Sequence, residues 1–138
     1  MQLSPNCSEA LVYAAEMHAQ QQRKSTDIPY VTHILAVTSI ALDYGADENE
    51  AIAALLHDGP EDAGGSDRLK DIRHRFGAIV GDIVAGCSET FEAPKPPWRQ
   101  RKEASIAHLQ QASQSVRLIA AADKLNRSRQ RADLRLCQ

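Results

Sequence analysis

Three segments of the sequence combine helical apolar spacing with ionisable residues at positions that such helices would bury. The segments are residues 29–44, the nearly continuous apolar run 51–56 with the two residues that follow it, and the run that begins at residue 116. The ionisable side chains concerned are His33, His57, Asp58 and Asp123. A buried ionisable group is costly unless it is paired or hydrogen-bonded. We therefore expect the fold to give these four side chains partners.

Helical spacing extends over most of the chain, whereas the strict alternation of a half-buried strand is missing. Ser8 and Asp47 stand where N-caps are expected. Gly59 and Pro60 should end the third helix, and three prolines predict a loop over 91–98. The helices predicted are 8–23, 29–44, 48–57, 67–76, 78–87, 98–111 and 116–136. The sequence thus predicts an all-α bundle of six to seven helices, forming one domain over residues 1–138.

Composition and charge narrow the functional class. The formal net charge of −2 offers no basic excess for nucleic acid or a membrane surface, and no apolar run approaches the length of a membrane span. The three cysteines lack CxxC spacing and are odd in number, so neither a disulfide framework nor a zinc knuckle is indicated. We expect a cytoplasmic protein. Residues after about 126 are basic and weakly patterned, which indicates an altered or truncated C-terminus.

The four buried ionisable residues together favour a metal site. A lone histidine on an apolar helix face is more often a satisfied core residue than a ligand, and the same reading holds for each of the four taken singly. Taken together, they offer two nitrogens and two carboxylates from three helices. This mixed set suits Mn²⁺, Fe²⁺ or Zn²⁺ with coordination positions left for water and substrate. A divalent ion that acidifies water and neutralises phosphate oxygens would drive attack on phosphorus.

Glu61 and Asp62 follow Asp58 by three and four residues, so a helical or tightly turned backbone carries one or both back towards the metal site. Their expected role is to orient the attacking water and take its proton, or to protonate the leaving oxygen. A solvated acidic loop leading into Gly64 is an equally good account of the spacing alone.

Several motifs, in order and spacing, resemble the HD-domain family that includes the hydrolase half of the RelA/SpoT alarmone enzymes and their small stand-alone relatives. The motifs are PYVTH, AALLHDGPED, RFGAIVGDIV, PWRQRK and AAADKL, and the resemblance spans about residues 10–126. It implies a helical fold in which His33, His57, Asp58 and Asp123 bind one metal, commonly Mn²⁺. It also implies removal of the 3′-pyrophosphate from (p)ppGpp.

The resemblance also assigns roles to residues outside the metal site. The catalytically important pair of the family falls on Glu61 and Asp62, and the basic pair that lies near the bound nucleotide falls on Arg23 and Lys24. On charge alone, that basic pair would instead be a helix C-terminus that complements the helix dipole. His18 is expected to be a packing or surface residue rather than a ligand.

The chain departs from the family at two motifs. Relatives carry an asparagine four residues after the last metal aspartate, where it contacts the sugar of the nucleotide. That position is Arg127 here, and Asn126, one place earlier and turned by about 100°, is the candidate substrate contact and should point elsewhere. The Gly59-Pro60 pair also replaces a small or hydroxyl residue followed by a β-branched one.

Two other functions remain open on these residues. The first is an HD phosphohydrolase for another nucleotide, such as a monophosphate, a dNTP or a cyclic nucleotide. The second is a metal-bound helical module without catalysis that senses nucleotides or serves in assembly. Each would keep the metal site and change what lies around it.

Overall fold

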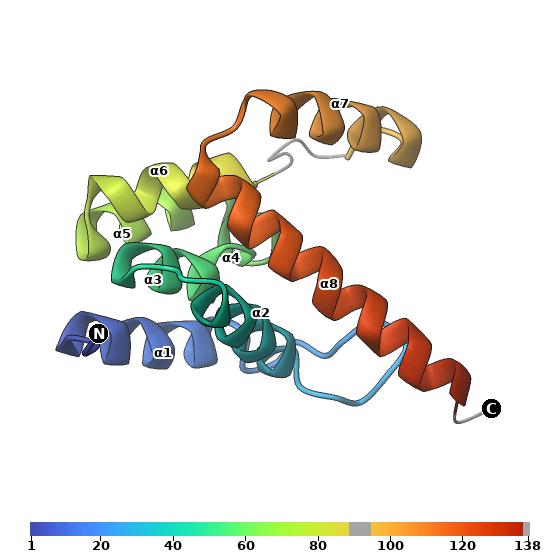
Figure 1. The fold of residues 1–138 in the computed structure, drawn as a ribbon, viewed down its shortest axis with the longest axis horizontal. Helices are drawn as coiled ribbons and strands as arrows, with labels where there is room; N and C mark the ends of the chain where they lie inside the picture. The colour runs from blue at the N-terminus through green and yellow to red at the C-terminus, as the bar shows by residue number, and fades with distance from the viewer. Residues whose placement is uncertain (89–94, 137–138) are drawn as a thin grey trace.

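The computed structural model describes residues 1–88 and 95–136, apart from the side chains of 133–135. Residues 91–94 of the expected loop, and Cys137, lie outside the described residues. Within the described part, the chain forms eight helices (Figure 1). They are α1 (Pro5–Met17), α2 (Val31–Asp43), α3 (Glu48–Leu56), α4 (Gly59–Asp62), α5 (Gly65–Phe76), α6 (Ala78–Cys87), α7 (Trp98–Gln111) and α8 (Gln114–Leu136).

The all-α prediction is confirmed. An isolated bridge between Gln22 and Pro29 is the sole β-type pairing among the described residues. The seven expected helices are all present, and the single-turn helix α4 is an addition to them. No helix in the described ranges has the length and apolar character needed to cross a membrane.

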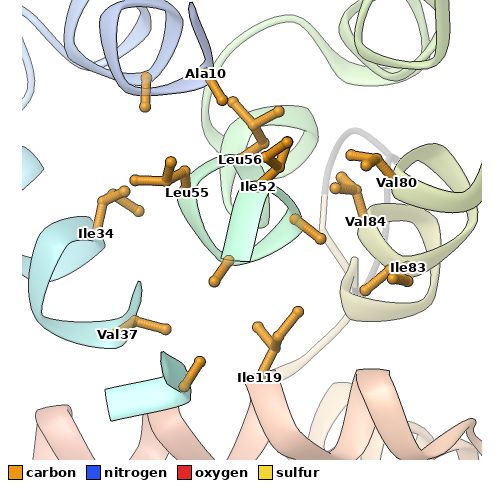
Figure 2. Packing of buried hydrophobic residues seen from close by; sticks show 14 of the residues in the cluster. Ala10, Ile34, Val37, Ile52, Leu55, Leu56, Val80, Ile83, Val84 and Ile119 are labelled. Atoms are coloured by element: carbon orange, nitrogen blue, oxygen red, sulfur yellow. The ribbon is translucent and has the colours of Figure 1, made fainter. Parts of the chain in front are cut away.

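Helix α3 lies at the centre of the bundle, and its neighbours surround it (Figure 1). Figure 2 shows the side chains of Ile52 and Leu56 among apolar groups from α1, α2, α6 and α8. All six residues from Ala51 to Leu56 are buried, because the helix is apolar on every side. The C-terminal end of α3 therefore delivers His57 and Asp58 into the interior.

The first helix is shifted relative to the sequence prediction. It begins at Pro5 rather than at residue 8, and it ends at Met17 rather than near residue 23. Ser4 is the N-cap, since its hydroxyl accepts the N–H of Asn6 and Pro5 suits the first helical position, where no N–H is needed. Arg23 consequently lies in a loop, and the helix-dipole account of the basic pair is wrong.

The turn after α3 also differs from expectation. Asp47 forms the predicted cap as part of a capping box with Glu50. At the other end, the chain turns at His57 and Asp58 and resumes helical conformation at once in α4. Pro60 is accommodated because the first residues of a helix have no acceptor for their N–H groups. The proline therefore helps to begin a helix instead of ending one.

Candidate metal centre

Four buried side chains from distant parts of the sequence converge where α2, the end of α3 and α8 meet. Each offers one ligand atom, and these atoms lie within 4.8 Å of one another. Nε2 of His33 is 2.8 Å from Oδ1 of Asp123, and Nε2 of His57 is 3.2 Å from Oδ1 of Asp58. The prediction that these four residues come together is in agreement with this geometry.

Both histidine rings are held by hydrogen bonds on the side away from the carboxylates. Nδ1 of His57 lies 2.6 Å from the backbone oxygen of Ala54, and Nδ1 of His33 lies 2.7 Å from Oδ1 of Asn126. A carbonyl oxygen only accepts, so each Nδ1 carries the hydrogen and donates it. Nε2 is then the nitrogen of each ring that faces the carboxylates, and it is the atom that would coordinate an ion after losing its hydrogen. The donor set therefore fits a divalent cation.

Tyr30 and Arg127 complete the wall of the site. The Tyr30 hydroxyl donates to Oδ2 of Asp58 at 2.5 Å, and Nε of Arg127 lies 3.2 Å from both carboxylate oxygens of Asp123. Nη2 of Arg127 also donates to the Tyr30 hydroxyl at 3.3 Å. Sequence reasoning did not assign either residue to the site. The available signal was spacing, because Tyr30 precedes His33 by three positions and Arg127 follows Asp123 by four.

The carboxylates shift the pKa values of their neighbours. Burial alone would lower the pKa of His57, but the charges of Asp58 and Asp123 outweigh it and raise this pKa to about 9. Burial would raise the pKa of Asp123, yet hydrogen bonds from the two histidines hold it well below the ordinary range. Burial and the nearby Asp58 raise the pKa of Tyr30. The site thus holds its negative charge firmly and attracts cations.

Arg23 and Asn126 lie together beside this cluster. Nη2 of Arg23 is 3.3 Å from Oδ1 of Asn126, the same oxygen that accepts from His33. Asn126 was expected to point elsewhere, but it follows Asp123 by three positions and shares its helix face. Burial lowers the pKa of Arg23, and the positive charge of Arg127 adds to this effect. Lys24 is exposed.

Glu61 and Asp62 lie on α4, one helical turn beyond the metal-site aspartate Asp58. Asp62 is exposed, and its Oδ2 accepts from Nε2 of Gln21 at 3.1 Å. Its charge contributes to the raised pKa of Tyr30. The charge of Glu61 acts on Cys87, whose pKa is raised to about 12 by burial and by carboxylates that include Asp58. Asp62 therefore acts on Tyr30 in the wall of the site, and Glu61 acts on a thiol that Asp58 and Asp123 also influence.

The family model for the HD domain matches residues 10–136, most of the chain. Among curated relatives, the guanosine-3′,5′-bis(diphosphate) 3′-pyrophosphohydrolase MESH1 of Xenopus tropicalis is 36% identical over 94% of this chain and 69% of its own length. The MESH1 protein of Drosophila melanogaster is also 36% identical, over 88% of this chain and 66% of its own length. The chain spans about two thirds of these relatives.

A solved structure of a metazoan ortholog of SpoT, described as hydrolysing ppGpp, superposes with a TM-score of 0.83 at 33% identity. The match covers 94% of this chain and 71% of that one. The fold, the ordered motifs and the clustered His and Asp side chains agree with these comparisons. The chain belongs to the HD-domain family, with the MESH1 and SpoT hydrolase domains as its homologues.

Proposed function

We propose that the chain is a metal-dependent phosphohydrolase that removes the 3′-pyrophosphate of (p)ppGpp. The observation that carries the proposal is the buried cluster of two histidines and two aspartates with ligand atoms within 4.8 Å of one another. The names of the MESH1 relatives support the choice of substrate. One hydrolase domain over residues 1–138, working in the cytoplasm on a small-molecule nucleotide, is part of the same proposal.

His33, His57, Asp58 and Asp123 would hold one divalent ion. Two imidazole nitrogens and two carboxylates suit Mn²⁺, with Fe²⁺ and Zn²⁺ as alternatives. Such an ion, when bound, supplies an acidified water and positive charge for phosphate oxygens. The protein contributes the orientation of the ligands, because Ala54 and Asn126 fix both rings.

Glu61 and Asp62 would handle protons on the α4 side of the cluster. One carboxylate accepts a proton from the attacking water while the bond between phosphorus and the 3′ oxygen breaks, and a proton returns to that oxygen. The products are the nucleoside 5′-diphosphate or triphosphate and pyrophosphate. Arg23 and Lys24 would bind the substrate with their positive charge, and Asn126 would contribute to the same region.

The proposal is tested by turnover with a matched pair of variants. Purified protein with added Mn²⁺ is expected to release pyrophosphate from ppGpp. Asp58→Ala should lower this rate by at least about 100-fold, because the ion loses one ligand and the negative charge of that carboxylate. Asp43→Ala, at an exposed position at the end of α2, is the control and should keep the wild-type rate. Absence of turnover in the wild type, or equal turnover in Asp58→Ala, contradicts the proposal.

Arg127 supports a second candidate function. A guanidinium stands beside the cluster where the family resemblance implies an asparagine that contacts the sugar. This change favours another nucleotide phosphate as the substrate. The same assay with a nucleoside monophosphate, a dNTP and a cyclic nucleotide separates the two functions. Binding of a nucleotide without any product would instead indicate a sensing or assembly module.

A further inference from the structure

The side chain of Gln21 connects the buried end of α1 to the exposed carboxylate of Asp62. Its Oε1 lies 2.7 Å from Nδ1 of His18, and its Nε2 lies 3.1 Å from Oδ2 of Asp62. His18 is 1% exposed, whereas Asp62 lies at the surface. The chain of contacts therefore runs from the core to one of the two acidic residues of α4.

The chemistry of the groups sets the direction of both hydrogen bonds. An ionised carboxylate only accepts, so the group of Gln21 that faces Asp62 must be the NH₂. The amide oxygen of Gln21 then faces His18, and Nδ1 of His18 must carry the hydrogen. Nε2 of His18 is left as an acceptor, and it has no hydrogen-bond partner within the part of the chain that the structure describes. An unpaired acceptor is cheaper to bury than an unpaired donor, which is consistent with this tautomer.

Gln21 is also fixed by its backbone. Its N–H donates to the oxygen of His18 at 3.0 Å, and its oxygen accepts the N–H of Tyr30 at 2.8 Å. The rings of His18 and Tyr30 lie 5.1 Å apart. Because the Tyr30 hydroxyl donates to Asp58, Gln21 is tied to the residues that hold the metal cluster as well as to Asp62. Rotation of its side chain would break two hydrogen bonds at once.

Helix α4 packs closely against the end of α1, and this packing brings Asp62 within hydrogen-bonding distance of Gln21. A Cβ atom built on Gly59 would lie 2.7 Å from Sδ of Met17, the residue before His18. Glycine at the first position of α4 therefore allows the one-turn helix to pack against Met17. Asp62, three residues later in the same turn, is then within reach of Gln21.

We propose that Gln21 is a positioning residue for Asp62, and that His18 holds Gln21 in the orientation that aims its amide donor at this carboxylate. The proposal rests on the proposed function, in which Asp62 handles a proton. An exposed carboxylate on a one-turn helix has several rotamers, and a misplacement of about 1 Å can lower a rate about 100-fold. The hydrogen bond from Gln21 selects one rotamer of Asp62 before the substrate binds.

The first experiment is a double-mutant cycle on kcat. Gln21→Ala should lower kcat for ppGpp about tenfold and leave KM within about twofold, since the change affects proton handling rather than substrate binding. In an Asp62→Ala background, measured by single turnover, Gln21→Ala should cause no further loss. Gln22→Ala, at an exposed neighbouring position, is the control and should keep the wild-type kcat. An equal loss in both backgrounds, or no loss in the first, overturns the proposal.

The second experiment separates hydrogen bonding from packing at His18. Asn keeps a side-chain N–H donor near the position of Nδ1, whereas Leu has similar bulk without a donor. His18→Asn should retain most of the kcat, and His18→Leu should lose as much as Gln21→Ala. Equal kcat values for the two variants, at equal thermal stability, contradict a positioning role.

A third measurement requires no turnover. Nitrogen NMR of the His18 ring in the wild-type protein should show the hydrogen on Nδ1, and a hydrogen on Nε2 alone would overturn the proposed chain. If the wild type releases no product from ppGpp, the proposed function fails while these ring spectra still decide the hydrogen bonding of Gln21. The two failures are thereby distinguishable.

Discussion

The two metal-site histidines are oriented by acceptors of different kinds. His57 donates to the backbone oxygen of Ala54, which the helix itself supplies, whereas His33 donates to the side chain of Asn126. A backbone oxygen is still present after its side chain is replaced, whereas a side-chain oxygen is lost when the residue is substituted. The orientation of His33 therefore depends on one replaceable residue of α8.

Replacement of Asn126 should weaken metal binding without removing a ligand. Asn126→Ala leaves the Nδ1–H of His33 without its acceptor, and loss of such a partner lowers metal affinity by about 10- to 100-fold. Calorimetric titration of the chelator-treated protein with Mn²⁺ measures the effect. Ser128→Ala, exposed on the same helix, is the control. Unchanged affinity in Asn126→Ala would show that the ring needs no such support.

The raised pKa of His57 predicts how the chelator-treated protein responds to alkaline pH. Its folded-state pKa of about 9 lies above the ordinary value of 6.5, so the protonated ring stabilises the fold fully below about pH 6.5. This contribution, at most about 3 kcal/mol, is lost as the pH rises through about 9. Thermal unfolding between pH 6 and pH 10 should show a larger decline in Tm for the wild type than for His57→Gln. Parallel curves would contradict this expectation.

At the scale of whole elements, two helices pack closely through a glycine. A Cβ atom built on Gly86 of α6 would lie 2.5 Å from Cγ2 of Val116, which is 4% exposed on α8. A Cβ built on Gly81 of the same helix would instead lie 3.0 Å from atoms of the Arg73 side chain. The guanidinium end of Arg73 can move because the side chain is partly exposed, whereas its Cβ atom moves only with α5. The two glycines thus differ in what an added methyl group would displace.

Gly86→Ala is accordingly expected to lower the free energy of unfolding by about 1–3 kcal/mol, the usual cost of overpacking a buried contact. Gly81→Ala is the comparison, and it should lower the free energy of unfolding by less than Gly86→Ala, because its closest contact would be 3.0 Å rather than 2.5 Å and alanine is the better helix former. Chemical denaturation of both variants measures the difference. If both variants are equally stable, α6 and α8 are free to move apart and the close packing is not a constraint.

Apolar runs and capping residues predicted most of the helices. Where a helix boundary was predicted wrongly, two such short-range features pointed to different boundaries. The apolar run before His57 and the Asp47 cap located α3 correctly, since both depend on neighbours in sequence. The start of α1 was misplaced because two serines were available as caps, and Pro5 beside Ser4 decides between them. A turned backbone at Glu61 and Asp62 was expected, but α4 was not predicted as a separate helix because Gly59 and Pro60 usually mark the end of a helix. In the site, Tyr30 was missed because its spacing from His33 indicates a shared helix face but not the contact with Asp58.

For the molecule as a whole, the four clustered side chains connect α2, the end of α3 and α8. An ion bound by all of them would hold these elements together, and a ligand that binds only the native state stabilises it by mass action. Free metal at 100 times its Kd should add about 2.7 kcal/mol to the free energy of unfolding. Differential scanning calorimetry with and without Mn²⁺ measures the gain in Tm.

His33→Ala is the variant that should lose this gain, because it removes one of the four ligands. Leu35→Ala, at a half-exposed position two residues along α2, serves as the comparison. If the two variants respond equally to the ion, the added stability comes from binding elsewhere on the surface.

The loop that carries Arg23 and Lys24 closes on itself before it joins α2. The N–H of Arg23 donates to the oxygen of Ile28 at 2.8 Å, and Gln22 pairs with Pro29. Residues 24, 25 and 27 are exposed, so the outer part of the loop contributes nothing to the core. Protein engineers could therefore exchange the outer part of the loop, residues 24–27, for segments of different length or charge. The cluster of histidines and aspartates would keep its geometry while the surface offered to an incoming nucleotide changed.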